Sequence, residues 1–115
     1  MSLPIHAHLP AASDLALGFM GFGGGWNAEP PDDAACAVAR AGLETALRAG
    51  ITVVDCADIY HFGKSEAVLG RLLAESPGLR DSIILQTKGG IRLPPMHGGT
   101  KRYDLSAQTI TAAID

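Results

Sequence analysis

The sequence predicts an α/β fold in which short parallel strands alternate with amphipathic helices. Three short apolar segments begin near residues 15, 51 and 83, so they recur about every 35 residues, the length of one strand–helix unit. Each of the first two is followed by a segment whose apolar residues recur at helical spacing. This alternation is typical of a parallel sheet with right-handed crossovers, and we expect the strands to pair in the order first, second, third.

The first expected strand runs from Leu15 to Met20 and leads into a glycine-rich loop. The Pro-Pro-Asp-Asp sequence at 30–33 marks the start of a helix, because proline and acidic side chains are favoured in a first turn. Gly50 is expected to end this helix in a left-handed conformation. Its apolar face is formed by small and aliphatic residues, namely Ala35, Val38, Ala39, Gly42, Leu43, Ala46 and Leu47.

Two more strands are expected at 51–54 and 83–85, both short and rich in β-branched or aliphatic residues. Neither alternates between apolar and polar residues, so both are expected to be buried. The polar loop at 55–63 separates the second strand from a helix that begins at Ser65 and stops near Pro77.

The third strand is followed by a long loop, rich in Gly, Pro and His, that extends to Asp104. Ser106 is expected to cap a last helix, with an apolar face of Ile110, Ala113 and Ile114. The chain ends at Asp115 without a Gly or Lys/Arg stop signal, so the sequence is expected to be a piece of a longer protein.

Composition excludes several classes of protein. The chain has 115 residues, of which 47% are hydrophobic and 18% charged, with a net charge of −3. This length suits one domain, and the lack of a basic surplus argues against nucleic acid as a partner. No stretch is typical of a membrane span or a signal peptide, so we expect a cytoplasmic protein with no membrane partner. Cys36 and Cys56 match no zinc or redox spacing, so we expect two buried thiols and no metal site.

An acid, a phenol and an ammonium follow neighbouring expected strands. Asp55 directly follows the second strand, Tyr60 lies in the next loop, and Lys88 ends the third strand. The carboxyl ends of parallel strands share one edge, where functional side chains gather. A nearby ammonium lowers the pKa of a phenol from its usual value of about 10, and a carboxylate orients the ammonium. The trio suits proton donation to a carbonyl oxygen while a hydride arrives at the carbon.

The wider sequence resembles the aldo-keto reductases. Residues 50–60, GITVVDCADIY, resemble the family signature G-I-x-x-x-D-x-A-x-x-Y, and GKSE at 63–66 and ILQTK at 84–88 resemble the segments that follow it. His61 stands where the family usually has glycine. The resemblance extends from about residue 15 to the end of the chain. It implies that residues 1–115 are a partial aldo-keto reductase domain, the N-terminal portion of a (β/α)₈ TIM barrel truncated before strand four.

The same resemblance implies an activity. Aldo-keto reductases reduce aldehydes or ketones with NADPH, so the expected partner of the parent enzyme is a small carbonyl compound. Asp55, Tyr60 and Lys88 match three members of the family's catalytic tetrad. The fourth, a histidine of strand four, would follow Asp115. His97 does not replace it, because it lies in the glycine-rich loop after the third strand, where we expect a solvated side chain.

Further positions correspond to family residues that contact the cofactor or the substrate. The end of the first strand, Gly18, Phe19 and Met20, together with Asp55, corresponds to family positions that contact the nicotinamide end of the cofactor. Met20 stands where tryptophan is common. Trp26 is expected to form a wall of the substrate pocket.

Two alternatives remain open from the sequence. GGGWNA at 23–28 fits the G-x-G-x-x-A pattern of a Rossmann-type nucleotide-binding module, with Asp55 at the end of the next strand. The prolines at 30–31 argue against it, because they place the helix start after the glycine motif rather than inside it. Alternatively, the chain is a catalytically inactive remnant, since a complete barrel needs ~250 residues.

Overall fold

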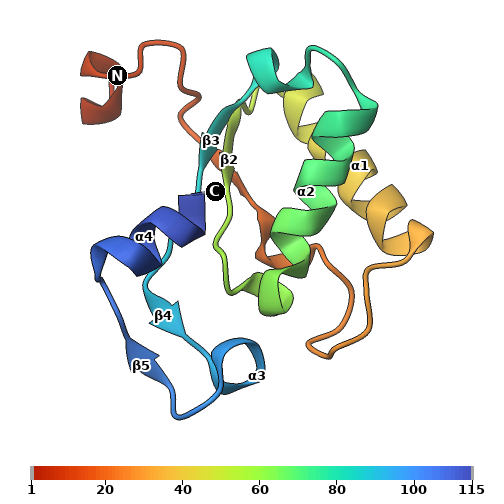
Figure 1. Ribbon diagram of the computed structural model, residues 1–115. Coiled ribbons are helices and arrows are strands. Elements are labelled where there is room, and N and C mark those ends of the chain that lie inside the picture. The colour runs from red at the N-terminus through yellow and green to blue at the C-terminus, as the bar shows by residue number, and fades with distance from the viewer. Residues whose placement is uncertain (1, 115) are drawn as a thin grey trace.

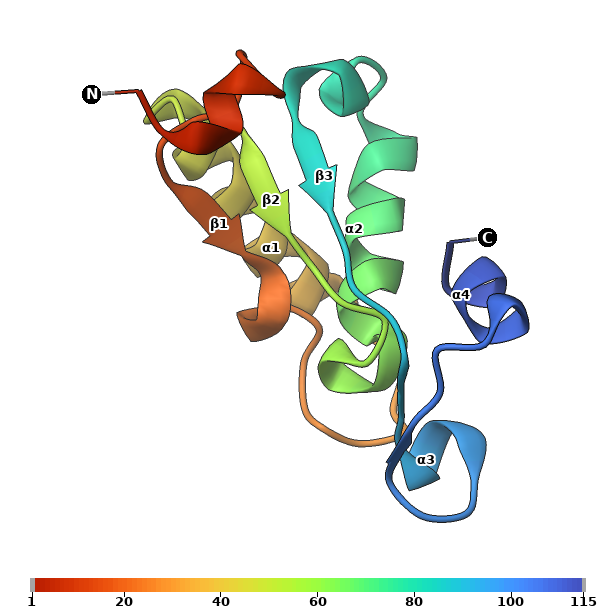
Figure 2. The same ribbon diagram turned by 90° about the vertical axis from the view of Figure 1, so that its left-hand side faces the viewer.

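The computed structural model describes residues 2–114, in which three parallel strands form a central sheet. The strands β1 (Ala16–Gly18), β2 (Val53–Asp55) and β3 (Ile84–Gln86) pair in the order β1-β2-β3. The two longest helices, α1 and α2, cover one face of this sheet, as Figures 1 and 2 show. The predicted α/β class and strand order are confirmed. The expectation about the end of the chain concerns Asp115, which lies outside the described residues.

Each strand is shorter than predicted or shifted along the chain. Strand β1 stops at Gly18, because the next residues turn into a short 3-10 helix, η2 (Phe19–Gly21). Strand β2 is buried as predicted, with Val53 and Val54 both inside the core. The predicted burial of the third strand is wrong for most of its length. Strand β3 is an outer strand of the sheet, so its residues are half-buried or exposed, whereas Ile83 just before it is buried.

Helix α1 (Asp33–Arg48) has the boundaries that its end signals predict. Asp32 caps its start, and the carboxylate accepts a main-chain N–H of the first turn at 2.7 Å. Gly50 follows the other end with a φ of 78°. This left-handed residue lets Ile51 donate its N–H to the Ala46 carbonyl at 2.9 Å, which is the closing bond of a Schellman motif. The chain thereby passes directly from α1 into the second strand segment.

Helix α2 (Lys64–Glu75) begins one residue earlier than predicted. It lies beside α1, and charged side chains link the two helices. Arg40 of α1 pairs with Glu75 and donates to the Ser76 hydroxyl at 3.0 Å. Arg71 of α2 pairs with Asp33 at 2.9 Å. Because these side chains are partly or largely exposed, the pairs orient the helices more than they stabilise them.

The segment predicted as a loop after the third strand contains regular structure. Strands β4 (Ile91–Arg92) and β5 (Arg102–Tyr103) form an antiparallel pair. The segment that connects them in the chain contains the short helix α3 (Pro94–His97). Two-residue strands carry no periodicity signal, which is why the sequence did not reveal them. Figure 2 shows this hairpin beyond the carboxyl ends of the three parallel strands.

Helix α4 (Ala107–Ile114) is capped as predicted, with the Thr109 N–H donating to the Ser106 hydroxyl at 3.3 Å. Its predicted apolar face is wrong, because Ile110 and Ile114 are exposed and Thr109 is the buried residue. In both views α4 stands apart from the layer formed by α1 and α2. Three further 3-10 helices occur at Pro4–Ala7 (η1), Tyr60–Gly63 (η3) and Leu79–Ser82 (η4).

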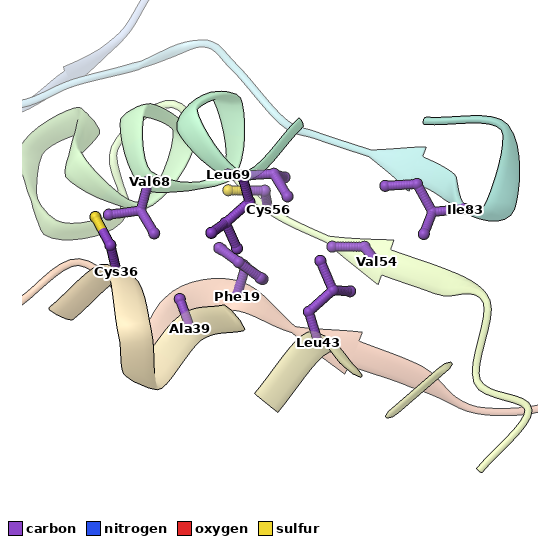
Figure 3. Packing of buried hydrophobic residues seen from close by; sticks show 10 residues of the cluster. Phe19, Cys36, Ala39, Leu43, Val54, Cys56, Val68, Leu69 and Ile83 are labelled. Carbon is purple, nitrogen blue, oxygen red and sulfur yellow. The ribbon is translucent and has the colours of Figure 1, made fainter. Parts of the chain in front are cut away.

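The core fills the space between the sheet and the helices α1 and α2 (Figure 3). Both cysteines are buried and unpaired, as predicted. Burial raises the pKa of the Cys56 thiol to about 11, so the group stays protonated at neutral pH. The core consists of ten buried residues: Phe19, Cys36, Ala39, Leu43, Val54, Cys56, Val68, Leu69, Leu72 and Ile83.

Within residues 2–114, each helix is too short or too polar to cross a lipid bilayer.

We expect Leu43→Ala to destabilise the fold strongly and Val38→Ala to leave it almost unchanged. Both residues lie on α1, but Leu43 is 2% exposed and Val38 is 62% exposed. Emptying a buried leucine site typically lowers the free energy of unfolding by about 2–5 kcal/mol, whereas a surface change costs within about 0.5 kcal/mol. Urea denaturation followed by circular dichroism measures both. Equal losses for the two variants would contradict the placement of the core.

Candidate functional site

The strand register aligns three residues at the carboxyl edge of the sheet. Gly18 of β1 lies opposite Asp55 of β2, which lies opposite Gln86 of β3. Side chains at this edge can therefore meet, and the Gln86 amide donates to the Asp55 carboxylate at 2.6 Å. This edge is where parallel α/β folds place functional groups.

Lys88 lies two residues beyond β3, and its side chain extends to Asp55 of the neighbouring strand. The ammonium Nζ lies 2.7 Å from Asp55 Oδ1 and 2.8 Å from Oδ2, and it donates to the Cys56 carbonyl at 2.7 Å. These acceptors fix the position of the charge. The Lys88 side chain is 45% exposed and that of Asp55 is 27% exposed, so the pair is oriented by several hydrogen bonds yet reachable from solvent.

Tyr60 lies beside this ion pair. It begins the 3-10 helix η3, packs against the core, and places its ring centroid 5.0 Å from Lys88 Nζ. The structure thus brings together Asp55, Tyr60 and Lys88. A hollow of about 190 Å³ lies against Tyr60 and Lys88. Its other lining residues come from the loops after β2 and β3 (Ala57, Asp58, Ile59 and Gly89) and from strand β4 (Ile91).

The surroundings favour the charged form of Lys88. Partial burial of the ammonium lowers its pKa, but the interactions with Asp55 and Tyr60 outweigh that effect and leave the pKa above its ordinary value. The ammonium therefore persists at neutral and moderately alkaline pH. A lasting positive charge therefore lies beside the Tyr60 ring.

The residues expected to contact a cofactor occupy different environments. Gly18 has open space beside it, since a Cβ there would meet no atom within 4 Å. Phe19 is fully buried in the core, so only its main chain is available to a ligand. Met20 has an exposed side chain, and its carbonyl accepts a hydrogen bond from His61. A flat ring such as nicotinamide would meet no side chain from Gly18 at this edge, next to Asp55.

Trp26 is held by two aromatic neighbours that the sequence did not reveal. Its ring stacks on His61, with centroids 4.7 Å apart and planes 22° apart, and meets the edge of Phe62 at 5.2 Å. The buried His61 ring also lies 2.6 Å from the Met20 carbonyl through Nε2. Trp26 itself remains exposed. The structure thereby fixes an exposed aromatic surface in the loop after β1, at the site end of the sheet.

The turn that carries His61 has a strained backbone. His61 has a φ of 50° and Phe62 a φ of 56°, both in the left-handed region, and Gly63 follows with a φ of 91°. Left-handed conformations cost non-glycine residues about 1–2 kcal/mol each. The one signal of this turn in the sequence is that His61 stands where the family usually has glycine. His61 makes its contacts with Met20 and Trp26 from this conformation.

His97 is not the solvated loop residue that we expected. It ends α3, is half-buried, and its Nε2 is buried without a hydrogen-bond partner. Burial, together with the positive charge of Arg92, lowers the pKa of His97. Burial also raises the pKa of Asp58, which interacts electrostatically with both of these residues. His97 therefore belongs to the packing of the hairpin.

Helix α1 begins at Asp33, after the glycine-rich segment 23–28. A Rossmann-type site needs the helix to begin inside the glycine motif, so that its N-terminus faces the phosphates. The Rossmann alternative is therefore wrong. Among residues 2–114, no three His, Cys, Asp or Glu side chains gather closely enough to hold a metal ion.

Known proteins share this sequence pattern. Residues 14–115 match the model of the Aldo/keto reductase family. The chain is 46% identical over 95 residues to a 6-dehydroglucose reductase from Novosphingobium aromaticivorans, which covers 77% of this chain and 28% of that protein. It is 36% identical over 84 residues to an NADH-specific methylglyoxal reductase from Escherichia coli, covering 69% of this chain and 23% of that protein.

The fold is similar to a crystal structure of a candidate aldo-keto reductase from Pseudomonas aeruginosa. The TM-score is 0.61 at 29% sequence identity, and the similarity covers 90% of this chain and 36% of that one. The parallel strands and helices described above therefore correspond to part of a TIM barrel. The chain spans between 23% and 36% of the length of these three proteins.

We expect Asp55→Asn to lower the pKa of Lys88, because the variant removes the carboxylate that favours the ammonium and leaves the effect of burial. The stability that the raised pKa contributes is present below the ordinary lysine value of 10.5 and is lost as pH rises through the folded-state pKa. Side-chain NMR titration measures this directly, since the chain has three lysines, Lys64, Lys88 and Lys101.

The matched control is Gln86→Met, which removes a neutral donor to Asp55 and keeps the ion pair. Its effect on the Lys88 titration is expected to be smaller. An unchanged Lys88 pKa in Asp55→Asn would show that the carboxylate does not hold the ammonium in solution.

Proposed function

This chain belongs to the aldo/keto reductase family, and on that premise we propose that its residues supply the proton-donating half of a nicotinamide-dependent carbonyl reductase. The observation that carries the proposal is the arrangement of Lys88, which is held by the Asp55 carboxylate and lies against the Tyr60 ring at the edge of the sheet. The resemblance of residues 50–60 and 84–88 to segments of the family signature supports the same three residues.

Each residue of the trio has a separate role in the proposed reaction. Tyr60 donates its phenolic proton to the carbonyl oxygen of the substrate as a hydride adds to the carbon, so the product is an alcohol. Lys88 stabilises the phenolate that remains, and a proton from solvent later restores the phenol. Asp55 keeps the ammonium charged and oriented, since it accepts through both carboxylate oxygens.

The hydride comes from a reduced nicotinamide when one is bound. Gly18 and Asp55 would hold its ring, because they lie side by side at the open edge of the sheet. The main chain of Phe19 and the exposed Met20 extend the same surface. NADPH is the cofactor that we propose. The Escherichia coli relative is NADH-specific by name, so both cofactors belong in the assay.

We propose a small polar aldehyde as the substrate class. The named relatives act on 6-dehydroglucose and on methylglyoxal. Trp26 supports the proposal, because its exposed ring is fixed by His61 and can form one wall of a substrate pocket. The hollow beside Tyr60 and Lys88 is about 190 Å³, which suits a compact reacting group.

A catalytically inactive remnant is the second candidate. The chain spans less than two-fifths of the length of the reductases to which it is similar, so its residues alone do not make up a complete barrel. A single assay separates the two candidates: turnover once the remaining strands are supplied supports the reductase, and its absence in a folded barrel supports the remnant.

We expect Tyr60→Phe to reduce carbonyl turnover by roughly 10²–10⁴-fold, since it removes the general acid, and to leave cofactor affinity nearly unchanged. The assay joins residues 14–115 to the remaining strands of the Novosphingobium aromaticivorans reductase, to which the chain is 46% identical over 95 residues. Oxidation of NADPH and NADH is followed with 6-dehydroglucose and methylglyoxal.

Tyr103→Phe is the matched control, because Tyr103 is the other tyrosine and is exposed on β5. It is expected to retain full activity. The 115-residue chain alone is expected to show no turnover. Near-normal activity of Tyr60→Phe would exclude Tyr60 as the proton donor, and an inactive but folded hybrid would exclude the reductase proposal.

A further inference from the structure

Lys64 is a buried cation whose hydrogen-bond partners are neutral. The residue is 8% exposed, and its Nζ donates at 2.9 Å to Asn27 Oδ1 and at 2.9 Å to the Glu29 main-chain carbonyl. An ammonium has three N–H donors, so one is left over. Within residues 2–114, no carboxylate lies within ion-pair distance of this nitrogen. Lysine is rarely buried in this way unless it is paired.

The start of helix α2 adds to this positive charge. Lys64 is the first residue of α2, where the helix dipole is also positive. Glu66 in the same turn faces away, because its carboxylate accepts from the Thr87 hydroxyl at 2.6 Å. Glu29 approaches Lys64 through its carbonyl, and its side chain is exposed. A charge without an internal counterion is costly to bury, which points to a counterion from outside the chain.

A hollow of about 400 Å³ lies against Lys64. It shares no lining residue with the hollow beside Tyr60 and Lys88. Apart from Lys64 and the amide of Asn27, its walls are apolar. They are formed by Ala28, Pro30, Phe62 and Pro95.

We propose that this hollow binds a small organic carboxylate with an apolar body. The carboxylate accepts the remaining ammonium donor of Lys64, and the apolar part packs against Phe62 and the two prolines. A single cation matches the single charge of a carboxylate. A phosphate carries more charge and more acceptors than one ammonium and one amide satisfy. The proposal does not depend on reductase activity.

The chain carries its own reporter for this site. Trp26 is the one tryptophan, precedes Asn27 and touches the edge of Phe62, so a ligand between these residues changes the environment of the indole. Binding can therefore be followed by fluorescence on the 115-residue chain itself.

The test titrates the chain with benzoate, with uncharged benzamide and with inorganic phosphate, all at constant ionic strength. We expect a saturable change in Trp26 fluorescence with benzoate and an affinity for benzamide and for phosphate that is at least about tenfold weaker, because each lacks one of the two matching features. Equal affinities for benzoate and benzamide would overturn the proposal, and so would tighter binding of phosphate.

Two variants and one control examine the role of the charge. Lys64→Met is expected to weaken benzoate binding at least about tenfold, whereas Lys101→Met, which changes an exposed lysine, leaves it unchanged. Asn27→Asp places a carboxylate next to the ammonium, so it is expected to weaken benzoate binding while the thermal midpoint of unfolding is kept or raised. This second variant decides the matter if Lys64→Met does not fold. Unchanged benzoate affinity in Asn27→Asp would overturn the proposal.

Discussion

The parallel register of three short strands is the constraint from which the site follows. Because Gly18, Asp55 and Gln86 end at one level, the residues just beyond them leave the sheet side by side. Lys88 can therefore reach both carboxylate oxygens of Asp55 and the adjacent Cys56 carbonyl. A shift of one residue in the β2–β3 pair would turn Asp55 to the other face of the sheet relative to β3 and break this contact.

The core beneath the strands makes that register costly to change. Val54 and Cys56 are buried among residues of both long helices, so moving β2 would expose apolar surface and open cavities. Beyond the core, the segment from His61 to Ser65 holds the loop that follows β1 through hydrogen bonds. His61 interacts with the Met20 carbonyl, Lys64 donates to the Glu29 carbonyl, and Ser65 donates to the carbonyl of Phe22. The strands that carry the site thus pack on the hydrophobic core, and the loop after β1 is held in place by these hydrogen bonds.

Much of this could be predicted from local signals. The proline and acidic residues before α1, and Gly50 after it, have direct conformational effects, so the helix boundaries could be read from the sequence. Asp55, Tyr60 and Lys88 follow from their places after the strands. The β4–β5 hairpin, the stacking of His61 on Trp26 and the burial of Lys64 could not be predicted in this way, because each depends on segments far apart in the sequence. Burial of β3 was overestimated, since apolar composition does not reveal which strand lies at an edge.

The protonation states of Cys56 and Lys88 determine whether these side chains can react with an aldehyde. Nucleophiles attack aldehydes: a thiolate adds to the carbonyl carbon and gives a hemithioacetal after protonation, and a free amine condenses with loss of water to give an imine. Cys56 and Lys88 are both next to Asp55, where the proposed carbonyl compound would react. Burial keeps the Cys56 thiol protonated, with a pKa of about 11, and the interactions with Asp55 and Tyr60 keep the Lys88 amine protonated. Burial of Cys56 and the ion pair of Lys88 with Asp55 therefore leave neither group as a competing nucleophile, so a carbonyl compound bound at this edge would not be trapped by the protein.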